Sequence, residues 1–117
     1  MFTFNHFNFN VKDLARSLAF YDEALELRPA RERRTDSYQL VYLGDGHSDF
    51  LLELTWLFDR AEPYDLGEQE FHLALTASDY EGALARHRAM GCVVQEDNGR
   101  FYFIEDPDGY WIEILRG

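Results

Sequence analysis

Two histidines and two glutamates occupy matching places in the two halves of this 117-residue sequence. His6 and His72 each open a segment of alternating apolar residues, and Glu53 and Glu113 each lie inside a later apolar run. Imidazole nitrogens and carboxylate oxygens together form the ligand set of many divalent metal sites. A lone strand histidine or glutamate is usually an ordinary residue, but two such pairs at equivalent positions favour metal binding. We therefore expect these four residues to bind a divalent metal.

The repeat that carries these residues can be followed through both halves. Residues 6–13 align with residues 72–79, so that the histidine, the apolar alternation and an acidic helix start share one register. Each segment ends on an aspartate placed as a helix N-cap, and apolar residues then recur at helical spacing. Each half ends with a similar strand, at 50–55 and at 110–115. The number of residues between the histidine and the glutamate differs between the halves, and a difference in loop length explains this.

Turn residues divide each half into further elements. In the first half we expect a strand over 3–11, a helix over 13–27, an irregular turn from Pro29 and a tight hairpin at 44–46. In the second half, Asn98-Gly99 is the clearest hairpin turn. The pattern predicts an α+β fold made of two βαβββ repeats, repeat one at about 3–56 and repeat two at about 70–117, with a linker over 57–69.

Strand alternation predicts the direction of the candidate ligands. His6 shares its strand face with Asn8 and Asn10, whereas the apolar residues between them face the other way. Glu53 and Glu113 alternate in the same manner with leucines and isoleucines. A carboxylate among such neighbours is costly unless it faces solvent, a hydrogen-bond donor or a cation.

Composition limits the class of protein. The formal charge is −11, which disfavours nucleic acid because phosphate binding requires clustered cations. Hydrophobic residues make up 46% of the chain, enough for one folded domain over 1–117, and no apolar run reaches membrane-spanning length. We expect a cytoplasmic protein whose partners include neither nucleic acid nor membrane.

Several other residues that could do chemistry have ordinary explanations. His47 lies in a turn, His87 lies on a helix without a partner carboxylate at ligand spacing, and the single cysteine, Cys92, lies among apolar residues. The one basic cluster follows the first helix. It is either a solvated face or a site that attracts an anion, and it comprises Arg28, Arg31, Arg33 and Arg34.

Motifs along nearly the whole chain resemble the vicinal oxygen chelate superfamily, which includes glyoxalases, bleomycin resistance proteins and dioxygenases. Within it, they are most similar to the bacterial glyoxalase I branch, the lactoylglutathione lyases. The Asp-Pro-Asp-Gly turn marks only the superfamily, whereas Glu-Leu-Thr with Tyr-Asp-Leu-Gly is more specific. The resemblance rests on segments 5–14, 17–21, 53–55, 64–67, 71–75 and 105–113.

The resemblance implies a fold, a metal and a reaction. The two repeats would form a curved mixed sheet, with His6 and Glu53 of one chain meeting His72 and Glu113 of its mate in a homodimer. The metal would be nickel or cobalt, with zinc or manganese as further possibilities. The small-molecule substrate would be the hemithioacetal of methylglyoxal and a thiol, which becomes a lactoyl thioester through an enediolate. Glu113 would be the base and Glu53 its mirror-related partner.

Three departures from the glyoxalase I pattern concern the substrate. Asn10 stands where the family usually has arginine, Leu57 stands where it has asparagine, and only residues 96–100 replace its lysine- and glycine-rich segment. In the family those positions hold the carboxylates of glutathione, so the thiol stays open. Two alternatives also stay open: a non-catalytic protein that binds an antibiotic or another small molecule, and another metal-dependent enzyme of the superfamily. Glu53 as a fourth ligand argues against the three-ligand enzymes.

Overall fold

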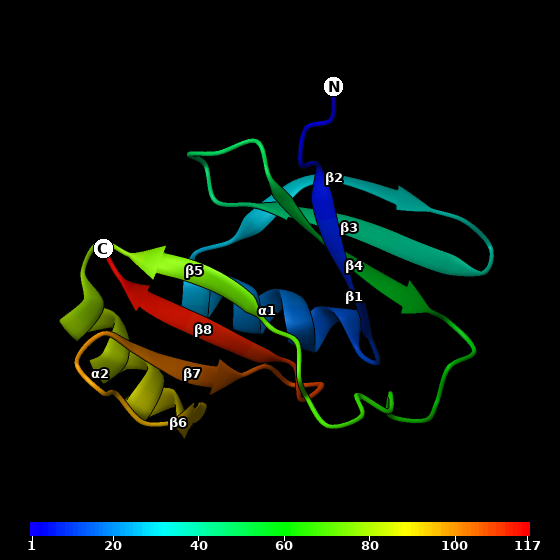
Figure 1. Ribbon diagram of the computed structural model, residues 1–117. Coiled ribbons are helices and arrows are strands. Elements are labelled where there is room, and N and C mark those ends of the chain that lie inside the picture. Colours follow the sequence, from blue (N-terminus) through cyan, green and yellow to red (C-terminus); the bar gives the residue numbers. More distant parts are fainter. The chain divides into compact units, whose positions relative to one another are not determined.

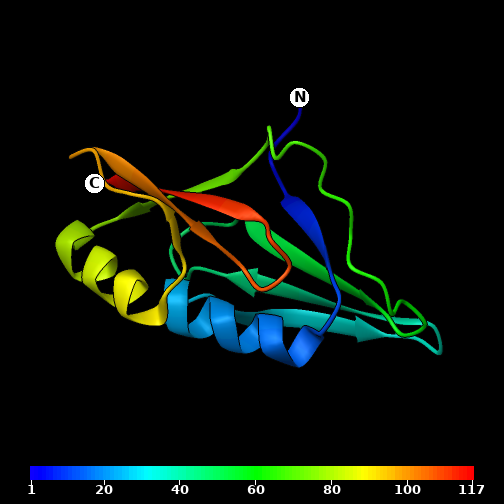
Figure 2. The same ribbon diagram turned by 90° about the horizontal axis from the view of Figure 1, so that it is seen from below.

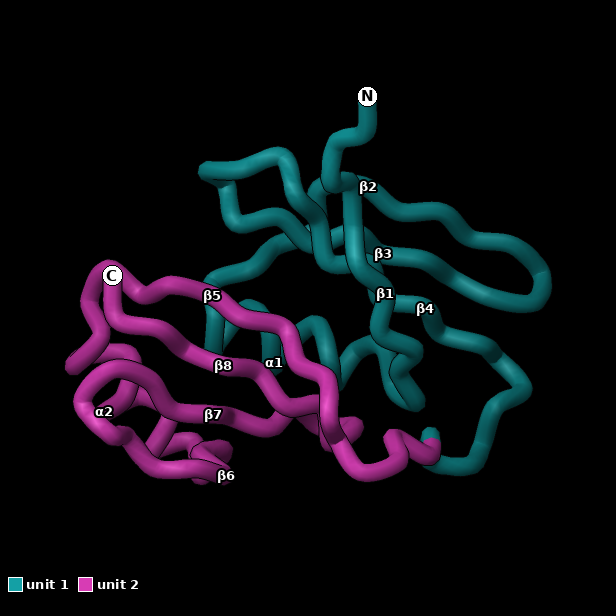
Figure 3. The backbone as a smooth tube through the Cα atoms, viewed as in Figure 1, with its two compact units in different colours: residues 1–64 teal, residues 65–117 magenta.

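The computed structural model describes residues 1–117, which form two compact units (Figure 3). Unit 1 comprises residues 1–64 and unit 2 comprises residues 65–117. The border between them falls inside the segment that the sequence predicted as a linker. Each unit contains one helix and four strands in the order βαβββ, which confirms the predicted α+β fold with two βαβββ repeats.

Unit 1 forms a four-stranded mixed sheet with the strand order β1-β4-β3-β2 (Figure 1). Strand β1 runs parallel to β4, and the other neighbours are antiparallel. The elements of unit 1 are β1 (His6–Val11), α1 (Leu14–Leu25), β2 (Arg28–Arg34), β3 (Tyr38–Gly44) and β4 (Leu51–Leu57).

Unit 2 repeats this topology with the strand order β5-β8-β7-β6. Strand β5 runs parallel to β8, as β1 does to β4. The elements of unit 2 are β5 (Leu73–Ala77), α2 (Tyr80–Met90), β6 (Val93–Gln95), β7 (Phe101–Glu105) and β8 (Trp111–Arg116).

Each helix packs on one face of its own sheet (Figure 2). The strand residues on that face are almost all apolar and buried, as alternation along the strands requires. In unit 1 the buried face consists of Phe9, Val11, Val41, Leu43, Leu52 and Leu54. In unit 2 it includes Tyr102, Ile104, Ile112 and Ile114. The opposite face of each sheet therefore carries the intervening, more polar residues.

The helix ends agree with the sequence signals. Asp13 accepts a hydrogen bond from the amide of Arg16 at 3.1 Å, and Asp79 accepts one from the amide of Gly82 at 3.0 Å. Both aspartates are therefore N-caps. Gly91 ends α2 in the left-handed conformation with φ 71°. Neither helix is long and apolar enough to cross a bilayer.

Three local predictions in unit 1 were wrong. The first strand begins at His6 rather than at residue 3, and a strand, β2, occupies the place of the irregular turn at Pro29. Proline is tolerated there because β2 is an edge strand whose register shifts between Pro29 and Arg31. The connection after β3 is not a tight hairpin, since the Asp45 carboxylate accepts from the amides of His47 and Ser48, both at 2.8 Å, within a longer loop.

Candidate metal centre

His6 and Glu53 form the first candidate half-site, on the sheet face of unit 1 that lies away from α1. His6 begins β1, and Glu53 lies at the centre of the neighbouring strand β4, where it is in register with Asn8. The Nε2 atom of His6 lies 3.7 Å from Oε1 of Glu53. The His6 side chain is 37% exposed and that of Glu53 is 12% exposed, so the pair lies at the surface with the carboxylate partly enclosed.

His72 and Glu113 form the second half-site in unit 2. His72 directly precedes β5, and Glu113 lies at the centre of β8, between buried Ile112 and Ile114. The Nε2 atom of His72 lies 3.2 Å from Oε1 of Glu113, with side-chain exposures of 41% and 18%. Parity along β8 therefore directs Glu113 away from the core, as it does Glu53 in unit 1.

The spacing within each half-site fits two neighbouring ligands of one cation. Nitrogen and oxygen ligands bind zinc-like metals at about 2.1 Å, so two of them at a right angle lie about 3 Å apart. The observed separations of 3.2 Å and 3.7 Å are close to that value. No three histidine, cysteine, aspartate or glutamate side chains of this chain gather closely enough to hold a metal ion. Each half-site thus brings together two candidate ligands.

Glu53 has further polar partners inside unit 1. Tyr42 lies opposite Glu53 in the register of β3 and β4. Asn8 lies on the other side, on β1. With its amide nitrogen turned toward the acceptors, Asn8 donates to Glu53 Oε1 at 3.0 Å. Polar side chains from both neighbouring strands therefore flank the carboxylate.

Tyr42 is itself held by its neighbours. The guanidinium carbon of Arg31 lies 4.3 Å from the centroid of the Tyr42 ring. The ring of His6 meets the Tyr42 ring edge-on, with 5.5 Å between centroids. Interaction with the Glu53 carboxylate and burial raise the pKa of Tyr42, and Arg31 opposes that rise.

The surroundings of Glu113 are apolar where those of Glu53 are polar. Phe103 lies opposite Glu113 in the register of β7 and β8, and Ala74 lies opposite it on β5. Phe103 meets the His72 ring edge-on at 5.0 Å, as Tyr42 does His6, but it carries no hydroxyl. His72 is accordingly the polar partner of Glu113 in unit 2. The two half-sites share geometry and differ in hydrogen bonding.

The other residues considered from the sequence are two histidines and the arginine cluster. His87 is buried and its Nδ1 lies 2.7 Å from the Tyr102 hydroxyl, which makes it a hydrogen-bonded core residue. His47 lies in the exposed loop after β3. In the basic cluster, Arg28 pairs with Asp22 at 3.2 Å and Arg34 bonds Gln39 at 2.8 Å, whereas Arg31 lies beside the first half-site.

Tyr42 and Asn8 were missed as site residues by reasoning from sequence. The alternation of β1 did place Asn8 on the His6 face, and Tyr42 belonged to a recognised strand. Strand alternation alone, however, does not say which residue lies opposite Glu53. That requires the register between β3 and β4, which the structure supplies.

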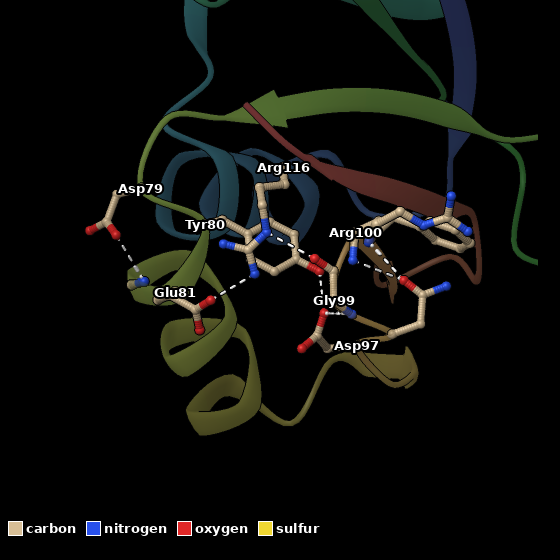
Figure 4. Close-up of polar contacts among 10 residues, drawn as sticks. Asp79, Tyr80, Glu81, Asp97, Gly99, Arg100 and Arg116 are labelled. Carbon is tan, nitrogen blue, oxygen red and sulfur yellow. Dashed lines mark hydrogen bonds and ion pairs between the residues drawn. The ribbon is translucent and has the colours of Figure 1, made fainter.

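A separate polar cluster ties the elements of unit 2 together (Figure 4). The Tyr80 hydroxyl donates to Asp97 at 2.5 Å, and the Arg116 guanidinium lies 4.0 Å from the Tyr80 ring centroid while it pairs with Glu81 at 2.7 Å. Burial and the bond to Asp97 raise the pKa of Tyr80 to about 12. The same hydrogen bond lowers the pKa of Asp97. This cluster joins α2 to β8 and the β6–β7 hairpin.

Comparison with known proteins bears on the site. The model of the Glyoxalase/Bleomycin resistance protein/Dioxygenase superfamily matches residues 3–114. The lactoylglutathione lyase of Salmonella typhimurium is 34% identical to this chain over 94% of the chain and 89% of the relative. The lactoylglutathione lyase of Haemophilus influenzae is also 34% identical, again over 94% of this chain and 89% of the relative.

Solved structures agree with these matches. The trypanothione-dependent glyoxalase I of Leishmania major superposes with a TM-score of 0.88 at 33% identity, over 99% of this chain and 87% of that one. TnmS3, an antibiotic-binding protein from a Streptomyces species, superposes with a TM-score of 0.76 over 99% of this chain and 96% of that one. At 19% identity that likeness shows the fold alone. From the matched residues and the shared fold, the chain belongs to the Glyoxalase/Bleomycin resistance protein/Dioxygenase superfamily.

Proposed function

We propose that this chain is a metal-dependent lyase of the glyoxalase I type, which converts the hemithioacetal of methylglyoxal and a thiol to a lactoyl thioester. The observation that carries the proposal is the occurrence of one histidine–glutamate pair in each repeat, with nitrogen to oxygen distances of 3.7 Å and 3.2 Å. Relatives at 34% identity that are named lactoylglutathione lyases support the same reaction.

The metal ligands would be His6, Glu53, His72 and Glu113. In this proposal two copies of the chain form a homodimer, and each site combines His6 and Glu53 of one copy with His72 and Glu113 of the other. Nickel or cobalt is the favoured metal, with zinc or manganese as alternatives. When bound, the divalent cation would supply Lewis-acid stabilisation of the negative oxygens of the enediolate.

The reaction moves one proton between adjacent carbons. Glu113 would accept the proton from the carbon that carries the hydroxyl and the sulfur, which leaves an enediolate across the two carbons. The same carboxyl group would then deliver a proton to the neighbouring carbon, so that the thioester carbonyl forms and no atom is gained or lost overall. Glu113 suits this role because its polar partner within unit 2 is His72 alone, and neutral neighbours such as Phe103 and Ala74 leave the carboxylate movable.

The thiol is the open part of the substrate. Asn10 and Leu57, the latter 37% exposed, lack the groups that would bind the carboxylates of glutathione. Arg31 is exposed beside the first half-site, where it offers a cation in an otherwise acidic protein. The relatives differ in the same respect, since the Leishmania major enzyme is described as trypanothione-dependent and the bacterial ones as lactoylglutathione lyases.

Turnover of a defined hemithioacetal panel tests the proposal. The protein is stripped with a chelator, reloaded separately with nickel, cobalt, zinc or manganese, and supplied with methylglyoxal and glutathione, trypanothione or another low-molecular-weight thiol. Metal-dependent formation of a lactoyl thioester is expected with at least one thiol. Glu113→Gln should lower turnover by about 10²- to 10⁴-fold, the usual contribution of a positioned base. His47→Gln, in an exposed loop, is the matched control and should keep full activity.

A negative result in this assay would contradict the proposal. If no combination of metal and thiol gives thioester, the lyase assignment is wrong. Tight stoichiometric binding of a cationic antibiotic to the metal-free protein would then support the binding-protein alternative, to which the formal charge of −11 is suited.

A further inference from the structure

We propose that Tyr42 is a positioning residue that fixes Glu53 as a constant metal ligand, and that Arg31 supports Tyr42 in this role. The inference rests on the proposed function, because it assigns different parts to the two glutamates of that site. Tyr42 and Arg31 have no counterparts beside Glu113. The role proposed for Tyr42 can therefore be wrong even if the chain is a lyase.

The first step is a row of three polar side chains on one face of the unit 1 sheet. Arg31, Tyr42 and Glu53 lie side by side on the adjacent strands β2, β3 and β4, as the register pairs Arg31 with Tyr42 and Tyr42 with Glu53. The Glu53 carboxylate raises the pKa of the Tyr42 hydroxyl and Arg31 lowers it, so the three polar groups interact with one another. Stacking of Arg31 on the Tyr42 ring at 4.3 Å limits rotation of the phenol.

The second step is the donor on the opposite side. Asn8 on β1 reaches Glu53 Oε1 at 3.0 Å with its amide turned toward the acceptors. The carboxylate is therefore bounded by polar side chains from β3 and β1, and it is 12% exposed. Hydrogen bonds of this kind orient metal ligands, and their loss typically costs tenfold to hundredfold in metal affinity or activity.

The third step is the contrast with the other repeat. Phe103 and Ala74 occupy the places in unit 2 that Tyr42 and Asn8 occupy in unit 1. Neither can donate a side-chain hydrogen bond to Glu113. The side chains on the flanking strands therefore hold the Glu53 carboxylate in place and leave the Glu113 carboxylate movable. Glu53 keeps its place as a ligand, and Glu113 retains the freedom that proton transfer requires.

A reciprocal exchange of one hydroxyl tests this. Tyr42→Phe removes the hydroxyl opposite Glu53, and Phe103→Tyr adds one opposite Glu113. Metal affinity is measured by competition with a chelator, with nickel and with cobalt, whose visible spectrum also reports ligand geometry. Tyr42→Phe should weaken metal binding by about tenfold to hundredfold and change the cobalt spectrum. Arg31→Gln should give a smaller loss in the same direction. Phe103→Tyr should leave affinity equal or higher and lower kcat.

Tyr38→Phe is the matched control, because Tyr38 lies on the same strand and face as Tyr42 but opposite Leu57. It should leave metal affinity unchanged. Thermal unfolding of each metal-free variant shows whether the fold is intact. Equal metal affinity for Tyr42→Phe and wild type would overturn the role of Tyr42, even if the wild type is an active lyase. A wild type that binds no metal would instead overturn the proposed function itself.

Discussion

The Nε2 atom of His72 lies 3.2 Å from the Oε1 atom of Glu113, and both residues belong to the same repeat. The same relation holds between His6 and Glu53 at 3.7 Å. Parallel pairing of β5 with β8, and of β1 with β4, produces both contacts. Each repeat therefore arranges its own histidine–glutamate pair.

Removal of either histidine should lower metal affinity to a similar extent, because each contributes one imidazole to the proposed four-ligand set. For His6→Ala and His72→Ala we expect a loss greater than tenfold, since even outer-shell changes at metal sites often cost that much. Chelator competition with nickel measures it. His87→Gln is unsuitable as a control because His87 is buried, so His47→Ala serves instead. A large loss in only one of the two histidine variants would contradict a shared site.

Metal binding should also stabilise the folded protein. A ligand that binds only the folded state at a hundredfold excess over its Kd stabilises it by about 2.7 kcal/mol. We expect nickel to raise the midpoint of thermal unfolding, and a chelator to reverse the rise. The His72→Ala variant should show almost no shift at the same nickel concentration. An equal shift in this variant would place the stabilising ion elsewhere.

Much of the fold followed from local sequence signals. Asp13 and Asp79 begin the helices as predicted, and strand alternation separated His6, Asn8 and Glu53 from the buried apolar face. These features depend on residues close in sequence, which is why a single chain reveals them. The irregular turn expected from Pro29 was wrong because proline usually interrupts strands, whereas here β2 is an edge strand whose register shifts beside Pro29.

The unequal surroundings of the two glutamates could not be predicted in the same way. The Tyr42–Glu53 pair depends on the register of β3 against β4. A shift of one residue would have directed Tyr42 to the other face. Alternation along a strand thus predicts the face of a residue but not its neighbour on the adjacent strand.

Stability should decrease at alkaline pH because of Tyr80. Its pKa is raised from 10.0 to about 12 in the folded protein, first by burial and then by the hydrogen bond to Asp97. The folded state therefore retains this proton where the unfolded state has lost it. The corresponding stabilisation is complete below pH 10 and is lost as the pH rises toward about 12. Urea unfolding from pH 8 upward should show a weaker pH dependence in Tyr80→Phe. In Asp97→Asn, which leaves Tyr80 buried, most of the dependence should remain.

Two buried tyrosine hydroxyls should respond in opposite ways to the same substitution. The Tyr102 hydroxyl lies 2.7 Å from Nδ1 of buried His87, so Tyr102→Phe removes the partner of a buried nitrogen. Such a loss costs about 1–3 kcal/mol. The Tyr64 hydroxyl is buried without a hydrogen-bond partner, and Tyr64→Phe removes a desolvated polar group instead. We expect this second variant to be as stable as the wild type or slightly more stable. Urea unfolding at neutral pH compares them, and a larger loss for Tyr64→Phe than for Tyr102→Phe would contradict the hydrogen bonding described for both residues.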